Sequence, residues 1–470
     1  MLEHPRLIQG GMGIGVSCWQ LARAVASLGQ LGVVSGTGID VVFSRQLQLG
    51  DKDGELREAL ENFPDQTIVR RILNRYFIPG GIGPTDSFRN PLRFTMQPPR
   101  DVIELAICAN FCQIWLAKQG HNGSVGVNYL EKLQLPLLPS IYGALLAHVD
   151  YILIGAGIPN QIPAILERLI QHQEVSYRVY VSGSSPSDDP RLTFNPRDFL
   201  HESPPPLTMP YFLPIVSSTV LAQRLMKAGR IDGFIIEGPL AGGHNAPPRG
   251  SLQLTENGEP VYGEKDTVDI DKLKGLNHPF WLAGTYASPE RMREALECGA
   301  HGIQVGSIFA LCEESGIDDG LKRAIRSRGY RGEQVIFTDP FASPTGFPFK
   351  VASVPGTIAE TEVYERRERK CDIGRLAQLF IEKNGSVGSR CSGEPTKRYI
   401  AKGGRMEDSV GRKCLCNGLL ATIGLQQRRG NGYVEPPLVT MGNDLSFLRK
   451  LMSDETSTYT AEKAVRYLLS

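Results

Sequence analysis

The chain has no excess of charge of either sign, no long apolar run and no internal repeat. Its 470 residues carry 51 basic and 50 acidic side chains, which gives a net charge of +1. This balance creates no field that would attract nucleic acid or an anionic membrane, so we expect neither as a partner. No segment approaches the ~18 consecutive apolar residues of a membrane span. The first residues, 1–5, show no basic region followed by an apolar one. We therefore expect a cytoplasmic protein without a signal peptide, whose nine cysteines are thiols or metal ligands.

What the sequence does contain is a regular alternation of short apolar runs and helical stretches. Eight such runs are typical of strands: residues 7–10, 32–36, 125–128, 151–155, 212–217, 233–237, 280–284 and 302–306. Strands that are apolar throughout and separated by helices indicate a parallel sheet covered on both faces. Several end in glycine or a small polar residue, where barrel active sites lie. We predict an α/β fold, a (β/α)8 TIM barrel.

Two regions exceed a minimal barrel. Residues of about 40–120 are largely helical, with predicted helices at 54–62, 67–76 and 101–118. A ninth apolar run at 178–182 is followed by a polar, proline-rich stretch and no helix, so we assign it to an insertion. We expect residues 1–312 to form the barrel with its helical insertion. Residues 313–470 would form a mixed or helical extension that contains cysteines.

The segment from Glu237 to His244 leaves an isoleucine-rich strand and passes through Gly242 and Gly243. Glycines there would let the backbone lie against a flat ring, with the histidine projecting over it. A neutral imidazole can accept a proton near pH 7, which makes His244 a candidate catalytic base. The alternative is a loop histidine that bonds only to backbone.

A candidate phosphate site follows the last two predicted strands. Gly284 and Thr285 end one strand, and Gly306 and Ser307 follow Gln304 at the end of the next. Loops at these positions commonly hold a phosphate in barrels, through backbone N–H groups and a helix N-terminus. We expect Ser288 to cap the helix that lies between the two strands.

The first predicted strand runs into Gly11, Met12 and Gly13. A Gly-x-Gly pattern also suits a dinucleotide site, but the acidic residue expected ~20 positions further on is absent, since Val33 stands there. We therefore predict a loop that passes under a flavin ring. Asn128, at the end of the third strand, is a candidate for hydrogen bonds to that ring.

These segments together resemble a known family. Residues 8–13, 127–128, 241–244 and 304–307 are similar to those of the nitronate monooxygenases, formerly called 2-nitropropane dioxygenases. The resemblance covers residues 5–350, and the same superfamily contains flavin-dependent enoyl reductases of fatty-acid and polyketide synthesis. It implies bound FMN, a histidine base that matches His244, backbone contacts at Met12 and Gly13, and phosphate contacts at Gly284, Gly306 and Ser307. Glu237 stands where the monooxygenases usually have glutamine.

The resemblance leaves the reaction open. One hypothesis is oxidation of nitronates or nitroalkanes with His244 as base. A second is an NAD(P)H-dependent enoyl reductase that acts on carrier-bound enoyl thioesters, with an acyl carrier protein as partner. The insertion and extension favour a bulky substrate of this kind. A third hypothesis, of another class, is a non-catalytic barrel that serves as a scaffold in a synthase assembly.

Four of the nine cysteines gather late in the chain, at Cys371, Cys391, Cys414 and Cys416. The basic neighbours Arg412 and Lys413 would favour thiolates. Four thiolates fit zinc or an iron–sulfur cluster, while the alternative is a set of unrelated buried cysteines. Cys108 and Cys112 have helical i, i+4 spacing and are predicted to lie in the core.

Overall fold

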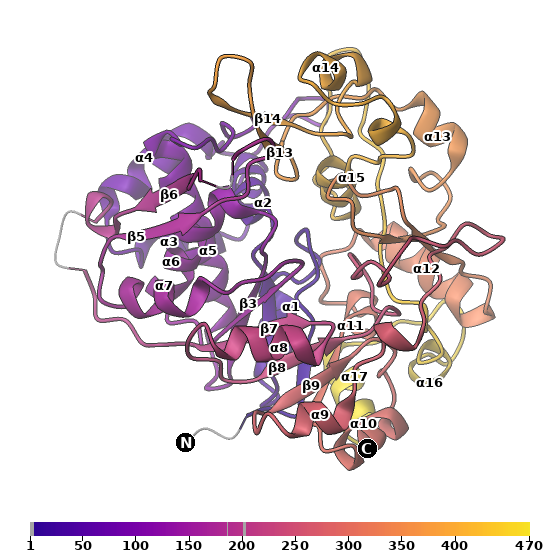
Figure 1. Ribbon diagram of the computed structural model, residues 1–470. Helices are drawn as coiled ribbons and strands as arrows, with labels where there is room; N and C mark the ends of the chain where they lie inside the picture. Colours follow the sequence, from indigo (N-terminus) through magenta and orange to yellow (C-terminus); the bar gives the residue numbers. More distant parts are fainter. Residues whose placement is uncertain (1–3, 186, 201–203) are drawn as a thin grey trace.

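Eight parallel strands form the centre of the molecule (Figure 1). The computed structural model describes residues 4–185, 187–200 and 204–470. The strands of the barrel are β1 (Leu7–Gln9), β2 (Gly32–Ser35), β3 (Val125–Leu130), β4 (Tyr151–Gly155), β7 (Tyr211–Val216), β8 (Phe234–Glu237), β9 (Phe280–Ala283) and β10 (Gly302–Val305). Each coincides with a strand predicted from the sequence, and the (β/α)8 fold is confirmed.

The sheet closes between its first two strands. The strand order is β1-β10-β9-β8-β7-β4-β3-β2, and all neighbouring pairs are parallel. Leu31 joins the two ends, because its N–H donates to the carbonyl of Leu7 and its carbonyl accepts from the N–H of Gln9, each over 3.0 Å. The open edges are thereby removed, as in a barrel.

Large apolar side chains fill the inside of the barrel. The interior cluster consists of Ile8, Leu31, Val33, Tyr151, Leu153, Leu213, Ile235, Trp281 and Ala283. The indole N–H of Trp281 donates to the carbonyl of Pro5 at the amino ends of the strands, over 2.8 Å. This end is therefore plugged, and only the carboxyl ends remain for a ligand.

Helices cover the outside of the barrel. They are α1 (Trp19–Ala26), α5 (Arg100–Ala117), α6 (Gln134–Leu146), α7 (Ile162–Leu169), α8 (Thr219–Met226), α9 (Ile270–Lys274) and α10 (Pro289–Glu297). The predicted helical insertion is present as α2 (Ile39–Gln48), α3 (Glu55–Glu61) and α4 (Gln66–Tyr76), which all pack on α5. Cys108 and Cys112 are fully buried in α5, as predicted. No helix in the described ranges is both long and apolar enough to cross a bilayer.

The ninth apolar run differs from its prediction. A strand, β5 (Val175–Arg178), precedes residues 179–182 and pairs antiparallel with β6 (Arg191–Phe194). This hairpin lies outside the barrel, as expected for an insertion. β6 lies within the polar stretch and was missed, because only every second side chain of β6 is buried.

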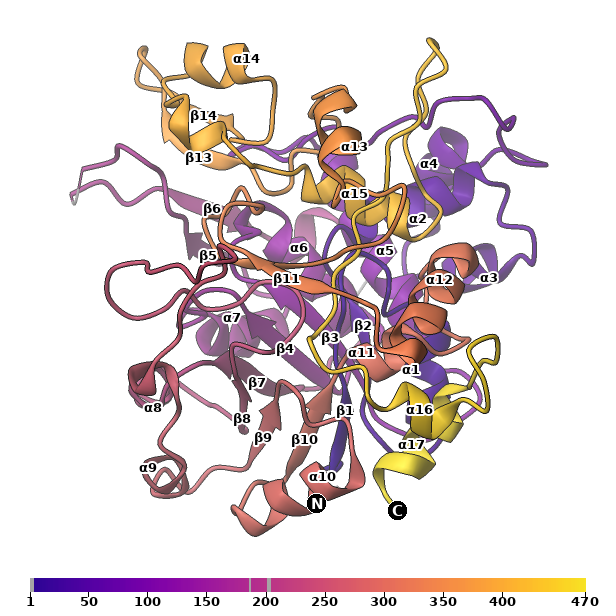
Figure 2. The same ribbon diagram turned by 90° about the vertical axis from the view of Figure 1, so that its right-hand side faces the viewer.

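The middle of the C-terminal extension, residues 361–422, lies at the end of the barrel opposite the N-terminus, whereas its last residues return to the side of the barrel (Figure 2). The extension contains α11 (Ser307–Ala310), α12 (Asp319–Arg331), β11 (Ile336–Asp339), β12 (Phe349–Ala352), α13 (Thr361–Arg366), β13 (Gln378–Ile381), β14 (Val387–Arg390), α14 (Thr396–Ala401), α15 (Leu415–Thr422), α16 (Leu448–Leu451) and α17 (Ala461–Leu468). The final helix returns to the barrel and packs against both α1 and α10. It thus occupies the place of the eighth outer helix.

Candidate active site

An inner chamber of about 230 Å³ lies at the carboxyl ends of the strands. Its walls include every residue that the sequence analysis placed at the cofactor site: Gly11, Met12, Gly13, Asn128, Glu237, Gly242, Gly243, His244, Gly284, Thr285, Gln304, Gly306 and Ser307. They come from the ends of β1, β3, β8, β9 and β10 and from the loops that follow. The barrel therefore brings together segments that lie almost 300 residues apart.

Glycine is required at two points of this wall because backbone and side chain approach closely. A Cβ atom on Gly11 would lie 2.3 Å from the Cβ of Asn128. A Cβ atom on Gly242 would lie 2.8 Å from the backbone nitrogen of Gly442. Both distances are far below van der Waals contact. The two loops can therefore adopt these positions only with glycine at 11 and 242.

Two buried carbonyl oxygens of the chamber wall lack a partner among the described residues. They are Asn128 Oδ1 and Gln304 Oε1. A hydrogen bond fixes the orientation of the Asn128 side chain, because its Nδ2 donates to the carbonyl of Gly11 over 2.9 Å. Buried acceptors that remain unpaired cost free energy unless a ligand supplies donors. The N–H edge of a flavin ring is such a donor set, so the chamber fits the group that the sequence analysis expected.

The far end of the chamber fits a phosphate. Backbone at Gly284, Thr285, Gly306 and Ser307 lines it, and Ser307 begins α11. Ser288 caps α10 by accepting from the N–H of Arg291, as predicted. The N–H groups and hydroxyls exposed here are those that bind an oxyanion.

One wall of the chamber was missed by the sequence analysis. Residues 440–444, from the C-terminal extension, reach into it. Thr440 Oγ1 accepts from the N–H of Gly243 over 2.9 Å, and the N–H of Gly442 donates to Ser307 Oγ over 2.8 Å. No local pattern in the sequence marks this segment, because its role comes only from contacts with loops more than 130 residues away.

His244 projects between this chamber and a second one. Its Nε2 lies 2.7 Å from Ser343 Oγ, which in turn lies 2.8 Å from Thr345 Oγ1. The ring packs edge-on against Phe349, with 4.8 Å between centroids. Burial lowers the pKa of His244 to about 4, so the imidazole is neutral at pH 7.

Glu237 shares both chambers with His244. Burial raises the pKa of its carboxyl to about 8. The side chain is therefore mostly protonated at pH 7, and it then resembles in charge and shape the glutamine usual in the family.

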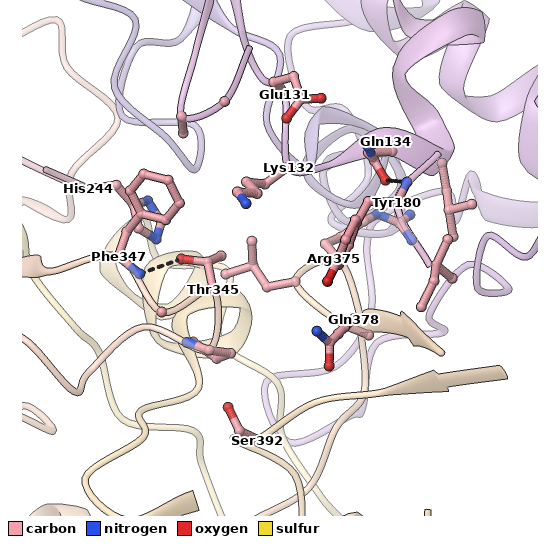
Figure 3. Close-up of a pocket in the computed structure, with 18 of the residues that line it drawn as sticks. Glu131, Lys132, Gln134, Tyr180, His244, Thr345, Phe347, Arg375, Gln378 and Ser392 are labelled. Carbon is pink, nitrogen blue, oxygen red and sulfur yellow. Dashed lines mark hydrogen bonds between the residues drawn. The ribbon is translucent and has the colours of Figure 1, made fainter. Parts of the chain in front are cut away.

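The outer chamber is much larger, about 850 Å³, and opens beside His244 (Figure 3). The barrel, the β5–β6 hairpin and the extension all contribute to its wall. The ammonium group of Lys132 reaches into the chamber, 5.1 Å from the ring centroid of Phe347. Four arginines also line it, Arg93, Arg375, Arg390 and Arg412, of which Arg375 is paired with Asp40. Besides Glu237, the acidic residues Glu131 and Asp408 line it as well, so basic residues are in excess. The chamber therefore suits a long ligand that carries negative charge.

Comparison with known proteins finds a family similarity in the region around His244. The family model "Nitronate monooxygenase" matches residues 208–343, which include Glu237, His244, Gly284 and Ser307. Over this stretch, the chain is similar to the nitronate monooxygenases. Members of the family are flavin-dependent oxidoreductases in general.

The chain spans less than half the length of the curated relatives that it matches. A nitronate monooxygenase of Pseudomonas aeruginosa is 28% identical over 145 residues, which are 30% of this chain and 40% of that protein. A Mycobacterium tuberculosis enzyme, named as a dehydrogenase of an octahydro-indene carboxyl-CoA, is 26% identical over 31% of this chain and 34% of its own. The structure of FabK from Thermotoga maritima shares the fold, with a TM-score of 0.50 and 16% identity over 99% of this chain and 92% of that one.

The four late cysteines lie within electrostatic range of one another, and one of them reaches the inner chamber. Cys416 lines the chamber, and the thiol of Cys391 lies within electrostatic range of Cys371, Cys414 and Cys416. Within the described ranges, no three His, Cys, Asp or Glu side chains are placed so that one ion could bind to all of them.

The expected effect of the neighbouring basic residues on these thiols is wrong. Arg412 donates to the carbonyl of Ser343, and Lys413 lies 3.5 Å from Asp339, so neither acts on Cys414. Burial instead raises the pKa of Cys414 to about 12. The charge of Arg367, a residue distant in the sequence, partly offsets this rise in the pKa of Cys414.

Proposed function

We propose that this protein is an FMN-dependent oxidoreductase that reduces the carbon–carbon double bond of an enoyl thioester. The observation that carries the proposal is the outer chamber of about 850 Å³ at His244. A nitroalkane of a few atoms needs no such space, whereas an acyl chain with its pantetheine arm fills a pocket of this size. Lys132 and the arginines of the wall suit the phosphate groups of coenzyme A or of a carrier-bound arm.

FMN would be held in the inner chamber by the loops at Gly11–Gly13 and Gly242–Gly243, with Asn128 and Gln304 accepting from the ring. Its phosphate would lie against Gly284, Thr285, Gly306 and Ser307. When bound, FMN supplies hydride-transfer chemistry, with NAD(P)H as the proposed donor. The protein supplies the position of the substrate and the proton.

His244 would handle the proton at the carbon next to the thioester carbonyl. The hydroxyl of Ser343 can donate to Nε2 while it accepts from Thr345, which leaves the proton of the neutral imidazole on Nδ1. Negative charge develops on the thioester as its β-carbon is reduced. The Nδ1 proton would then pass to the α-carbon while Nε2 takes the proton of Ser343, and Ser343 would take that of Thr345. Water in the outer chamber would return a proton to Thr345.

The test is an assay of FMN-loaded protein with three substrates. We expect NAD(P)H oxidation to depend on an enoyl-CoA, to be weaker with the matching N-acetylcysteamine thioester, and to be absent with 2-nitropropane.

Lys132→Ala should raise KM about tenfold for the enoyl-CoA and leave KM for the phosphate-free thioester unchanged, since one charge-assisted contact is lost. Turnover of neither thioester would contradict the proposal. A protein that takes up no FMN would favour the scaffold hypothesis instead.

Oxidation of a nitronate or nitroalkane is the second candidate. The neutral imidazole of His244 favours it, because a base that abstracts a proton from carbon must be unprotonated at working pH. The resemblance to the Pseudomonas aeruginosa enzyme also supports it. Oxygen consumption with 2-nitropropane and no thioester-dependent NAD(P)H oxidation would decide for this candidate.

A further inference from the structure

Three separate segments of the extension pack together around the four late cysteines. Asn417, in the first turns of α15, donates to the carboxylate of Asp372 over 3.0 Å and so holds the segment of Cys371 against that of Cys416. A Cβ atom on Gly393 would lie 3.3 Å from the carbonyl oxygen of Lys413 and 3.7 Å from the sulfur of Cys391. The loop of Cys391 therefore lies directly beside Cys414.

Backbone N–H groups point at the sulfur atoms of this group. Gly374 directs its N–H to Cys371, Gly393 directs its N–H to Cys391, and the N–H groups of residues 375 and 376 lie at Cys416. Hydrogen bonds of this kind to sulfur are a feature of sites in which thiolates bind an iron–sulfur cluster. Two of these turns have the form Cys-x-x-Gly or Cys-x-Gly, in which glycine lets the chain fold back over the sulfur.

Cations surround the group on the protein side. Each of three cysteines lies within electrostatic range of an arginine. The pairs are Cys371 with Arg93, Cys414 with Arg367, and Cys416 with Arg375. The carboxylates nearby are already paired, since Lys402 Nζ lies 3.0 Å from Glu394 and Arg367 pairs with Glu435. Arg375 is likewise paired with Asp40, so Arg93 beside Cys371 is the cation of the three that would offset the negative charge of a group bound by four thiolates.

We propose that Cys371, Cys391, Cys414 and Cys416 bind an iron–sulfur cluster beside the cofactor chamber. A single zinc ion needs its four sulfurs to converge on one point at ~2.3 Å, an arrangement not found among the described residues. In a cluster the thiolates bind different iron atoms and surround a larger group, so they need not converge. Cys416 lines the inner chamber, which places the cluster next to the flavin position. The site is independent of the substrate proposed above.

The test is metal and sulfide analysis of the full-length protein, purified without oxygen or reconstituted with ferrous iron and sulfide. We expect about two or four iron atoms and as many acid-labile sulfides per chain, and an electron paramagnetic resonance signal after reduction with dithionite. The visible absorption of the cluster should remain after the flavin has been removed. Iron near zero after reconstitution would overturn the proposal, and so would one zinc ion per chain without sulfide.

Substitution of the ligands provides the matched comparison. Cys391→Ser and Cys414→Ser should each lower iron content at least several-fold, while Cys298→Ser, at an exposed cysteine elsewhere, should keep the wild-type content. Unchanged iron content in both ligand variants would overturn the assignment. If these variants fail to fold, the analysis of the wild-type protein decides alone, because its readouts need no variant.

Discussion

At the scale of single residues, the site combines two buried titratable groups whose pKa values are shifted in opposite directions. Burial lowers the pKa of His244 and raises that of Glu237, so both are uncharged near neutral pH. Because neither group is charged, neither repels the negative charge that would develop on the substrate. Each group therefore has a distinct, testable consequence.

His244→Asn should keep FMN and lose most turnover. Asparagine keeps a polar side chain but cannot exchange a proton near neutral pH, and loss of a general acid or base costs about 10²–10⁴ in rate. Cofactor occupancy should be unchanged, because backbone and amide groups line the flavin position. The measurements are kcat with the enoyl-CoA and the flavin-to-protein ratio. Wild-type turnover, or loss of FMN, would contradict the assigned role.

Glu237 should set the alkaline limit of activity. Its carboxyl is protonated below its pKa of about 8 and becomes negative as the pH rises through that value. The new charge would oppose the negative charge that develops on the substrate, so kcat/KM should fall above pH 8. In Glu237→Gln the side chain stays neutral and this fall should vanish. The check is a pH profile of both proteins, and an identical alkaline fall in the variant would show that another group titrates.

At the scale of elements, the cofactor chamber depends on loops from opposite ends of the chain. The loop after β8 contacts residues 440–442 through Gly242 and Gly243. Gly442 in turn bonds to Ser307, at the phosphate end. The extension is therefore part of the cofactor site.

Gly242→Ala should weaken FMN binding more than it affects folding. The added methyl group would lie 2.8 Å from the backbone nitrogen of Gly442, so one of the two loops must move. We expect at least a tenfold rise in the Kd for FMN, measured by flavin fluorescence. Gly430→Ala is the matched control, because no atom lies within 4 Å of a Cβ placed there. Equal Kd values for both variants would show that the contact carries no binding energy.

At the scale of the whole molecule, the last helix is a component of the barrel. Leu468 of α17 is fully buried, whereas the next residue, Leu469, is 43% exposed. Because α17 packs between α1 and α10, it should unfold together with the barrel.

Leu468→Ala should lower the free energy of unfolding by about 2–4 kcal/mol, as for other buried leucines, while Leu469→Ala should cost about 0.5 kcal/mol or less. The measurement is urea unfolding followed by the fluorescence of the three tryptophans. If both variants unfold like wild type, α17 is not coupled to the barrel.

The sequence was most informative where local patterns decide structure. Continuous apolar runs located all eight barrel strands, because both faces of a parallel barrel are buried. Gly11, Gly13, Gly242 and Gly243 marked loops that line the inner chamber, because close backbone approach requires glycine there. Residues 440–444 could not be found in this way, since their place depends on the path of the extension. The low pKa of His244 was also hidden, because it comes from burial by Ser343, Phe349 and their neighbours.

The position of α17 also bears on when the protein can first work in the cell. During synthesis β1 emerges from the ribosome long before residues 440–444 and α17. Until residues 440–444 have emerged, the chamber lacks the wall that contacts Gly243 and Ser307. Until α17 has emerged, the groove between α1 and α10 stays uncovered. The inner chamber is therefore completed only after all eight barrel strands have been made, and the barrel stays partly uncovered until α17 packs on α1 and α10.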